Sequence, residues 1–213
     1  MNISNQPRFE TALAHVDALN QCDPNMDIVN DKPYPKELLY SERMSAMLQR
    51  YAPDASEVLQ LAVRCQHIQR WKIARSSYPM TKAGYYQWRT ELKSFYAEVT
   101  RQVLADAGYD AAVIDRVCAL VKKALPVNDP ASDPISAYES QTLEDVVVLV
   151  FLESYLEQFV ASHADYGQAK FIDILNKTLN KTSLKARQAA LNKITIAAGL
   201  KPLLEQLITK MDA

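Results

Sequence analysis

One of the three histidines in this chain of 213 residues stands among side chains that could do chemistry. His67 lies in QHIQRW, where Arg70 and Trp71 follow it by three and four positions. We expect this stretch to be helical, and on a helix such spacings bring side chains to neighbouring points of one surface. An imidazole beside a guanidinium can act as a general acid or base next to a bound anion. We therefore expect His67 to carry acid-base chemistry or to bind a ligand.

A second aromatic and basic group follows in GYYQWR, and the short loop sequence RSSYP separates it from the first. Arginine binds phosphate through a fork of hydrogen bonds, and aromatic rings stack on planar groups. Both groups could therefore line a pocket for a planar anionic ligand. The alternative is that the two clusters only pack helices together. The ligand-binding candidates on this part of the chain are Arg43, Gln66, Arg70, Trp71, Arg75, Tyr85, Trp88 and Arg89.

Two carboxylates, Glu144 and Asp145, stand directly before the apolar run VVVLVFL. Asp145 shares a helix face with Val148 and Leu152, so it is expected to point inward, where an unpaired carboxylate is costly. Its partner would be a metal ion, His67 or an arginine. We predict His67, Asp145 and Glu144 as catalytic residues, with His67 and Asp145 as candidate ligands of a divalent metal. The alternative for Asp145 is a structural ion pair or a carboxylate that complements a helix dipole.

The charge of the chain is unevenly distributed, although its net value is −1. Residues 174–213 contain seven basic and two acidic side chains, a net charge of +5, which leaves −6 for residues 1–173. Within KTLNKTSLKAR, lysines alternate with threonine and serine, a combination that can hold phosphate. We predict that Lys177 and Lys181 contact the ligand, or an RNA backbone, with a solvated helix face as the alternative.

The composition removes several functional classes. Four glycines are too few for the tight turns of a β-sandwich or for glycine-rich phosphate loops. The motifs GxSxG, GxxxxGKS/T and HExxH are absent, so no known catalytic triad, P-loop or zinc protease helix is expected. The three cysteines are widely spaced without CxxC pairing, which predicts buried free thiols.

Apolar residues recur with helical spacing along most of the chain, which predicts an all-α protein. We expect a single helical domain over residues 1–213, a bundle of about nine helices, with residues 174–204 as a basic helical segment packed on it. The run VVVLVFL could also be a buried strand, but helical spacing continues on both sides of it. Gly108 is placed to end a helix. Helices are expected near 7–21, 36–52, 54–71, 84–107, 110–125, 141–163, 167–180, 183–198 and 202–211, with proline-rich loops at 22–35 and 126–136.

Neither a membrane nor a secretory signal is expected from the sequence. The longest apolar run, residues 146–152, is far shorter than the roughly 18 residues of a membrane span. The first residues lack a basic region followed by an apolar stretch, so we expect a cytoplasmic protein.

Several segments resemble one family over nearly the whole chain. PKELLYSERM, LAVRCQHIQRW, RSSYPMTKAGYYQWR, QTLEDVVVLVFLE and ILNKTLNKTS, in this order and spacing, resemble the helical family called domain of unknown function 4202 (DUF4202). This resemblance implies a helical fold and brings no activity with it.

A more remote similarity is to the HD-domain phosphohydrolases, helical proteins in which histidines and aspartates bind a metal that activates water against a phosphate ester. It would imply an HD-like core, with Tyr40 and Ser41 at the position of the first histidine, Gln66 and His67 at that of the His-Asp pair, and Asp145 at the last aspartate. Tyr40 and Gln66 are poor metal ligands, so the similarity implies a degenerate site.

Two functions remain open from the sequence. The first is binding, with or without hydrolysis, of a small phosphorylated metabolite or nucleotide, with His67 and Asp145 as acid-base or metal-binding residues. The alternative is a non-catalytic module that binds a nucleotide or RNA, or an adaptor. The expected partner is a phosphorylated molecule or nucleotide, with RNA as a weaker candidate, and neither DNA nor a membrane.

Overall fold

The computed structural model describes residues 6–124 and 133–212, which form a predominantly helical protein. Ten α-helices, two short 3-10 helices and one two-stranded hairpin occur in these two ranges. The expected helical class is therefore confirmed. The chain divides into two compact units, residues 1–140 and 141–213, so the expectation of one domain stays a prediction.

Most of the described elements belong to the first unit. It contains α1 (Gln6–Asn20), β1 (Met26–Val29), β2 (Lys32–Pro35), α2 (Lys36–Tyr51), α3 (Glu57–Arg64), the 3-10 helices η1 (Arg70–Lys72) and η2 (Arg75–Ser77), α4 (Lys82–Asp106) and α5 (Ala111–Lys122). The long helix α6 (Pro134–Ser154) begins in this unit and continues in the second. The second unit adds α7 (Leu156–Ser162), α8 (Gln168–Leu179), α9 (Leu184–Asn192) and α10 (Lys201–Asp212).

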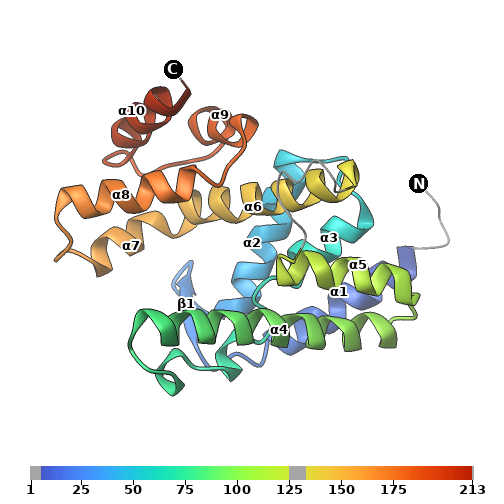
Figure 1. Cartoon of the computed structure of the whole chain (residues 1–213). Helices are drawn as coiled ribbons and strands as arrows, with labels where there is room; N and C mark the ends of the chain where they lie inside the picture. The colour runs from blue at the N-terminus through green and yellow to red at the C-terminus, as the bar shows by residue number, and fades with distance from the viewer. Residues whose placement is uncertain (1–5, 125–132, 213) are drawn as a thin grey trace. The chain divides into compact units, whose positions relative to one another are not determined.

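The core of the first unit lies where α3, α4 and α5 meet. Helix α5 runs along α4, and α3 contacts α2 and α5 (Figure 1). Leu59, Leu92 and Leu104 are wholly buried there. Each such side chain contributes about 1.5–3 kcal/mol by leaving water. Glu139, at the start of α6, accepts hydrogen bonds from Ser56 at 2.5 Å and from Arg116 at 2.8 Å, which ties α6 to α3 and α5.

Side chains and backbone set the ends of these helices as expected from capping chemistry. Ser56, Thr81 and Asp110 precede α3, α4 and α5, and each side chain accepts a hydrogen bond from a backbone N–H of the first turn. Gly108 has a φ of 81° directly after α4. The predicted helix end at Gly108 is confirmed.

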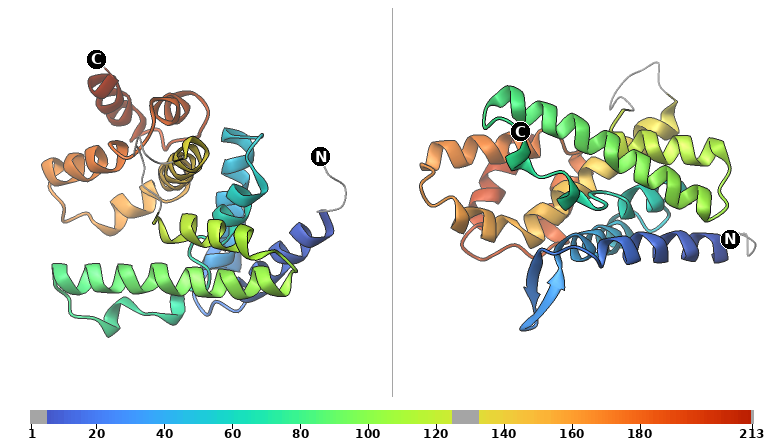
Figure 2. Two further views of the ribbon diagram at one scale, coloured as in Figure 1. Left: turned by 45° about the vertical axis from the view of Figure 1, so that its right-hand side comes forward. Right: turned by 90° about the horizontal axis from the view of Figure 1, so that it is seen from below.

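Residues 22–35 are not helical, as their prolines predict, but they contain a hairpin that the sequence did not predict. β1 and β2 pair antiparallel, with Val29 opposite Lys32, and the hairpin projects from the helices of the first unit (Figure 2). The two connecting residues, Asn30 and Asp31, have φ values of 49° and 61°. This is the two-residue turn that glycine usually supplies, and asparagine and aspartate can also adopt it. A low glycine content therefore does not exclude a hairpin.

The expected helix over residues 54–71 is also wrong in its second half. α3 ends at Arg64, and the backbone turns into the left-handed region at His67, with a φ of 63°, and again at Gln69, with a φ of 50°. The Gln69 N–H donates to Asn20 Oδ1 at 3.0 Å. In a continuous helix, this N–H would bond within the helix and could not reach Asn20. His67, Arg70 and Trp71 consequently do not share one helical surface.

The second unit is held by aromatic and ionic contacts. Phe159 of α7 packs on Phe171 of α8, with ring centroids 6.3 Å apart. Arg187 of α9 donates to Asp212 of α10 at 2.6 Å and to the Thr182 carbonyl at 2.7 Å. The run VVVLVFL is helical, as predicted. The helix expected over 141–163 is interrupted at Tyr155, between α6 and α7. α9 ends six residues before the predicted end at 198.

Two further findings concern sequence expectations. No helix within the described ranges is long and apolar enough to cross a membrane. Residues 126–132 of the proline-rich loop expected at 126–136 lie outside the described residues. Its last three residues are helical, because α6 begins at Pro134, a residue type that the first turn of a helix accepts.

Gly84 generates a first prediction. A Cβ at this position would lie 2.2 Å from the carbonyl oxygen of Pro79, so the loop before α4 can close on the first helical turn only because residue 84 has no side chain. We expect Gly84→Ala to lower the free energy of unfolding by about 1–3 kcal/mol despite the better helix propensity of alanine.

Chemical denaturation would measure this loss. Gly199→Ala is the matched control, because a Cβ added at that position would have no neighbouring atom within 4 Å, and it should change stability by less than about 0.5 kcal/mol. Equal stability of the two variants would contradict the close-approach argument.

Candidate functional site

The structure brings titratable and aromatic side chains together in the first unit, in a group called here the Glu37–His67 cluster: Glu37, Tyr40, His67, Arg70, Trp88 and Tyr96. The His67 ring stacks on Tyr40, with centroids 4.4 Å apart and planes inclined by 14°. Its Nδ1 lies 3.7 Å from Glu37 Oε2. The Tyr96 ring centroid is 5.8 Å from that of His67.

Arg70 forms the cationic side of this cluster. Its Nη1 donates to the Tyr96 hydroxyl at 3.1 Å, and its Nε lies 4.0 Å from Glu37 Oε1. The guanidinium carbon stands 4.8 Å from the ring centroid of Trp88. Trp88 is fixed in turn, because its Nε1 donates to the Ile73 carbonyl at 2.9 Å. A flat cation held between a carboxylate and an indole is arranged to meet an anion.

The position of Glu37 follows from the turn before α2. The Asp23 carboxylate, which is 1% exposed, accepts the Glu37 N–H at 3.0 Å and the Asn25 N–H at 2.9 Å. The Asn20 side chain donates to the Glu37 carbonyl at 3.5 Å. The backbone N–H of Glu37 is therefore tied to the segment that follows α1, and its carbonyl to the last residue of α1.

The left-handed conformation of His67 is a second positioning device. A non-glycine residue with positive φ costs on the order of 1 kcal/mol and persists only where the surroundings impose it. The Ile68 N–H bonds back to the Cys65 carbonyl, and the Arg70 N–H to the His67 carbonyl at 2.9 Å. These tight turns aim His67 and Arg70 at Glu37 from a segment with little freedom.

Burial dominates the electrostatics of the cluster. It raises the pKa of Glu37 to about 7, against the opposing effect of Arg70 and with a further increase from Asp23. It also lowers the pKa of His67 well below its usual value, assisted by the charges of Arg70, Arg89 and Lys123. The imidazole is consequently neutral at pH 7, while Glu37 can both take up and release a proton.

A ligand could reach part of this cluster from solvent. The side chains of His67 and Arg70 are each 25% exposed, whereas that of Glu37 is 10% exposed. Burial also raises the pKa of Tyr96 to about 12, which keeps its hydroxyl protonated and able to donate. The accessible atoms are thus an imidazole and a guanidinium, with a nearly covered carboxyl behind them.

The remaining first-unit candidates surround the cluster to different extents. Arg89 is half-buried and near enough to His67 and Tyr96 to lower both pKa values. Arg75 closes the loop before α4, donating to the carbonyls of Tyr78 and Pro79. Tyr85 is 44% exposed, and its ring centroid lies 5.9 Å from that of Trp88.

Three other first-unit candidates have less direct placements. Gln66 is 3% exposed and donates to the Ala62 carbonyl at 3.4 Å. Trp71 is half-buried in η1, and Arg43 is half-buried on α2. Their contact with a ligand stays a prediction.

Asp145 lies in the second unit and has a well-defined structural environment. It is 2% exposed, its Oδ1 accepts the Ser183 N–H at 2.8 Å, and its Oδ2 accepts the Ser183 hydroxyl at 2.6 Å. The Gln141 side chain donates to the same carboxylate at 2.9 Å and to the Lys181 carbonyl at 2.9 Å. Because the Ser183 hydroxyl accepts the N–H of Ala186, Asp145 fixes the residue that caps α9. These contacts give Asp145 a structural role at the cap of α9, although it stands in the middle of α6 and not at a helix start.

The other second-unit candidates stand near this cap. Glu144 is half-buried on α6. Lys177 is exposed and bonds to Asp173 at 2.6 Å, one turn earlier on α8. Lys181 is exposed directly before the cap. Among the residues that the structure describes, no group of three or more His, Cys, Asp or Glu side chains could hold a metal ion.

The comparison with protein families fixes the relationship of the chain. Residues 10–204 match the family described as "Domain of unknown function (DUF4202)". The chain belongs to the DUF4202 family. Neither the curated proteins nor the solved structures gave a significant match. The resemblance to DUF4202 is confirmed over most of the chain, whereas the remote similarity to HD-domain phosphohydrolases is not supported.

DUF4202 membership assigns no chemistry, so the candidate site is argued from its geometry alone. Two residues of the cluster, Glu37 and Tyr96, were not predicted from the sequence. A lone glutamate in the first turn of a helix usually complements the helix dipole at the surface. The signal that could have found it is its context in PKELLYSERM, where leucines directly follow Glu37 and Tyr40 shares its face one turn later.

The raised pKa of Glu37 predicts how stability depends on pH. The folded carboxyl holds its proton up to about pH 7, whereas its usual pKa is 4.5, so stability is lost as pH rises through this window. Glu37→Gln removes this loss. We expect the variant to gain about 2 kcal/mol relative to wild type between pH 5 and pH 8.

Denaturation at the two pH values would test this expectation. The control is Glu205→Gln, whose side chain is 50% exposed and 4.0 Å from Lys201, and it should show no such gain. The His67 effect, which runs in the opposite direction, is present in both proteins. A difference between Glu37→Gln and wild type that does not change with pH would show that Glu37 ionises normally.

The environment of Asp145 predicts a structural role. Asp145→Ala removes the acceptor of the Ser183 N–H and hydroxyl, and we expect the unfolding free energy to fall by about 2–3 kcal/mol. Amide hydrogen exchange in the first turn of α9 should rise with it. Lys177→Ala, at an exposed surface pair, is the control and should stay within about 0.5 kcal/mol of wild type. Unchanged protection of α9 in Asp145→Ala would refute this role.

Proposed function

We propose that the first unit binds a small phosphorylated metabolite or nucleotide at the Glu37–His67 cluster and hydrolyses its phosphoester bond. The observation that carries the proposal is the position of a nearly buried carboxyl, Glu37, beside the imidazole of His67. A carboxyl with a pKa of about 7 lies 3.7 Å from a neutral imidazole, and buried carboxyls tuned in this way are common where protons are transferred.

The chemistry assigned to Glu37 is proton transfer in both directions. As a carboxylate, it accepts a proton from the water whose oxygen attacks the phosphorus. As the resulting carboxylic acid, it returns that proton to the leaving oxygen when the ester P–O bond breaks. The neutral His67 ring, stacked on Tyr40, orients the water by a hydrogen bond and takes no net charge.

The anionic part of the ligand would be bound by Arg70, with Arg89 adding positive charge. Arg70 already has a carboxylate neighbour and an indole beneath it, so its guanidinium is pre-oriented at little entropic cost. Tyr85, which is 44% exposed and lies beside Trp88, offers a ring face for a planar base. This proposal uses only first-unit residues and does not require Asp145, Glu144, Lys177 or Lys181.

An activity panel tests the proposed hydrolysis. The purified protein should turn over at least one member of a set of nucleotides and sugar phosphates, measured as released phosphate with and without Mn²⁺. Glu37→Gln should lower kcat by about 10²–10⁴-fold with little change in KM, as expected for loss of a proton carrier. The rising limb of the pH–rate profile should have its midpoint near pH 7 in wild type.

Matched variants separate catalysis from binding. Arg70→Lys should raise KM more than it lowers kcat, because the charge stays and the planar fork is lost. His67→Asn keeps a residue that tolerates positive φ, so it removes the imidazole with less risk to the turn. No turnover of any panel member would contradict the hydrolytic role.

A specific observation favours the alternative of non-catalytic nucleotide or RNA binding. Residues 58–90 contain six basic side chains and no acidic one, and Tyr85 and Tyr86 on this segment are 44% and 57% exposed. Exposed rings among cations are suited to stacking on bases along a phosphate backbone. Saturable binding without turnover, weakened by salt and by joint replacement of Tyr85 and Tyr86, would favour this function instead.

A further inference from the structure

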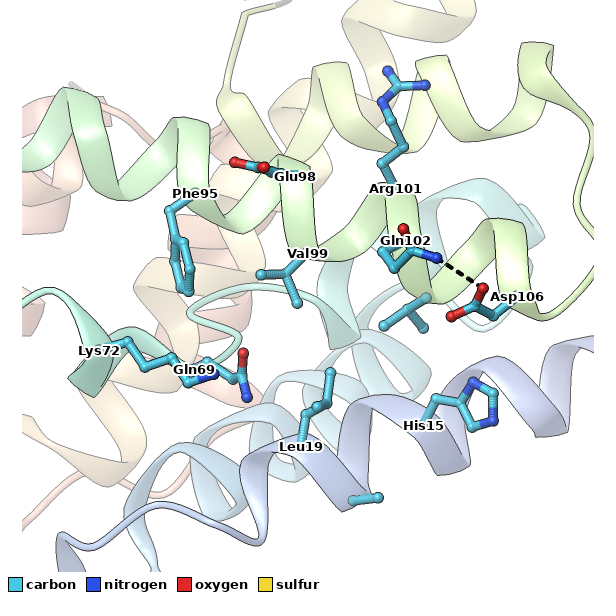
Figure 3. A pocket seen from close by; sticks show the side chains of 12 residues that line it. His15, Leu19, Gln69, Lys72, Phe95, Glu98, Val99, Arg101, Gln102 and Asp106 are labelled. Carbon is cyan, nitrogen blue, oxygen red and sulfur yellow. Dashed lines mark hydrogen bonds between the residues drawn. The ribbon is translucent and has the colours of Figure 1, made fainter.

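A cavity of the first unit lies between α1 and α4, and no step of the proposed hydrolysis uses it. Its volume of about 850 Å³ is within the range of small-molecule sites. Figure 3 shows the side chains that line it. We propose that this cavity binds an amphipathic monocarboxylate, such as a medium-chain fatty acid, with its carboxylate at Gln69 and Lys72.

The apolar part of the cavity fits an elongated chain. Leu19 of α1 faces Phe95, Val99 and Val103 of α4, which recur every fourth residue and so form one stripe. From Phe95 to Asp106 the lining residues of α4 extend over eleven positions, or about 16 Å along the helix. A long narrow apolar floor contacts an alkyl chain better than it contacts a compact metabolite.

Gln69 supplies a polar group that has no use inside the protein. Its residue is 6% exposed and lines the cavity, and its side-chain amide makes no hydrogen bond with the described residues. Its backbone is held in the left-handed region by the bond to Asn20, which is itself fully buried. The amide atoms of Gln69 are accessible at the cavity and not enclosed by protein, so they can donate to the acceptor of a ligand bound there.

The charges around the cavity favour a ligand with a single negative charge at the Gln69 end. Lys72 extends toward Gln69 in Figure 3, and Arg101 and Glu98 of α4 also line the cavity. Arg101 is engaged by Asp115 at 2.7 Å. Asp106, which accepts from Gln102 at 2.8 Å, lies at the far end. An ammonium at one end, opposed by a distant carboxylate at the other, suits a monoanion with an apolar tail and disfavours a phosphate dianion.

Calorimetric titration with sodium decanoate, below its micelle concentration and at pH 7.5, tests this assignment on the full chain. We expect one molar equivalent to bind, with decanol at least about tenfold weaker, since the alcohol lacks the charge that Lys72 meets. Lys72→Gln should erase the preference for decanoate over decanol. Equal affinity for acid and alcohol in wild type would overturn the placement of the carboxylate.

Two substitutions at Gln69 guard against misfolding as an explanation. Gln69→Gly removes the amide at a position where glycine adopts the observed φ without strain, so stability should be retained while decanoate binding weakens roughly tenfold. Gln69→Asn keeps an amide and also tolerates positive φ, so it should restore part of the affinity. Lys82→Gln, an exposed cation outside the cavity, is the control.

The outcomes separate this site from the other one. Blocking the apolar floor with Val99→Trp should abolish decanoate binding and leave phosphoester turnover, if present, intact. Decanoate that binds the Val99→Trp variant as tightly as wild type, or binds in many equivalents, would show surface adsorption and refute the site. Failure of the hydrolytic proposal would leave this result unchanged, because no residue is shared between the two assays.

Discussion

The backbone turn at residues 65–70 is the constraint on which both proposed sites depend. Two residues without the freedom of glycine, His67 and Gln69, occupy the left-handed region within three positions. A buried asparagine holds this arrangement: Asn20 accepts the N–H of Gln69 and donates to the carbonyl of Glu37. The side chain of the last residue of α1 therefore sets the orientation of the turn and its distance from the first turn of α2.

The burial of Glu37 explains why the cluster does not contain a simple ion pair between Glu37 and His67. A carboxylate removed from water is costly, and a single cation at 4.0 Å, itself partly exposed, does not fully offset that cost. The protein instead leaves the carboxyl able to keep its proton near pH 7 and keeps His67 neutral beside it. If Glu37 and His67 were both ionised, they would form a tight ion pair. The positive charges of Arg70 and Arg89 oppose this, because they disfavour a protonated His67. Glu37 can therefore gain or lose one proton near pH 7.

Sequence patterns located most helices because burial repeats every three or four residues along each of them. α4 and α6 follow directly from such spacing, and the end of α4 follows from Gly108. The patterns failed where single hydrogen bonds override local preference. The Asn30–Asp31 turn and the left-handed residues after α3 depend on contacts with distant segments, and no periodicity in the sequence contains that information. Glu37 was missed for the same reason, since its burial arises from the Asp23 turn and the residues of α4. The sequence singled out His67, Arg70 and Trp88, and the structure brings them into one cluster, while their role in binding stays a prediction.

Consecutive residues of one turn can serve ligands of different chemistry because the turn alternates the direction of its side chains. His67 and Arg70 face a carboxyl, a phenol and an indole, which is an environment for charge and proton transfer. Gln69 faces an apolar floor with one cation nearby, which is an environment for a long monoanion. A helix through this segment would also separate Gln69 from His67, because residues two apart lie on nearly opposite sides of a helix. What the two positive φ values add is the bond from the Gln69 N–H to Asn20, made while His67 and Arg70 lie beside Glu37.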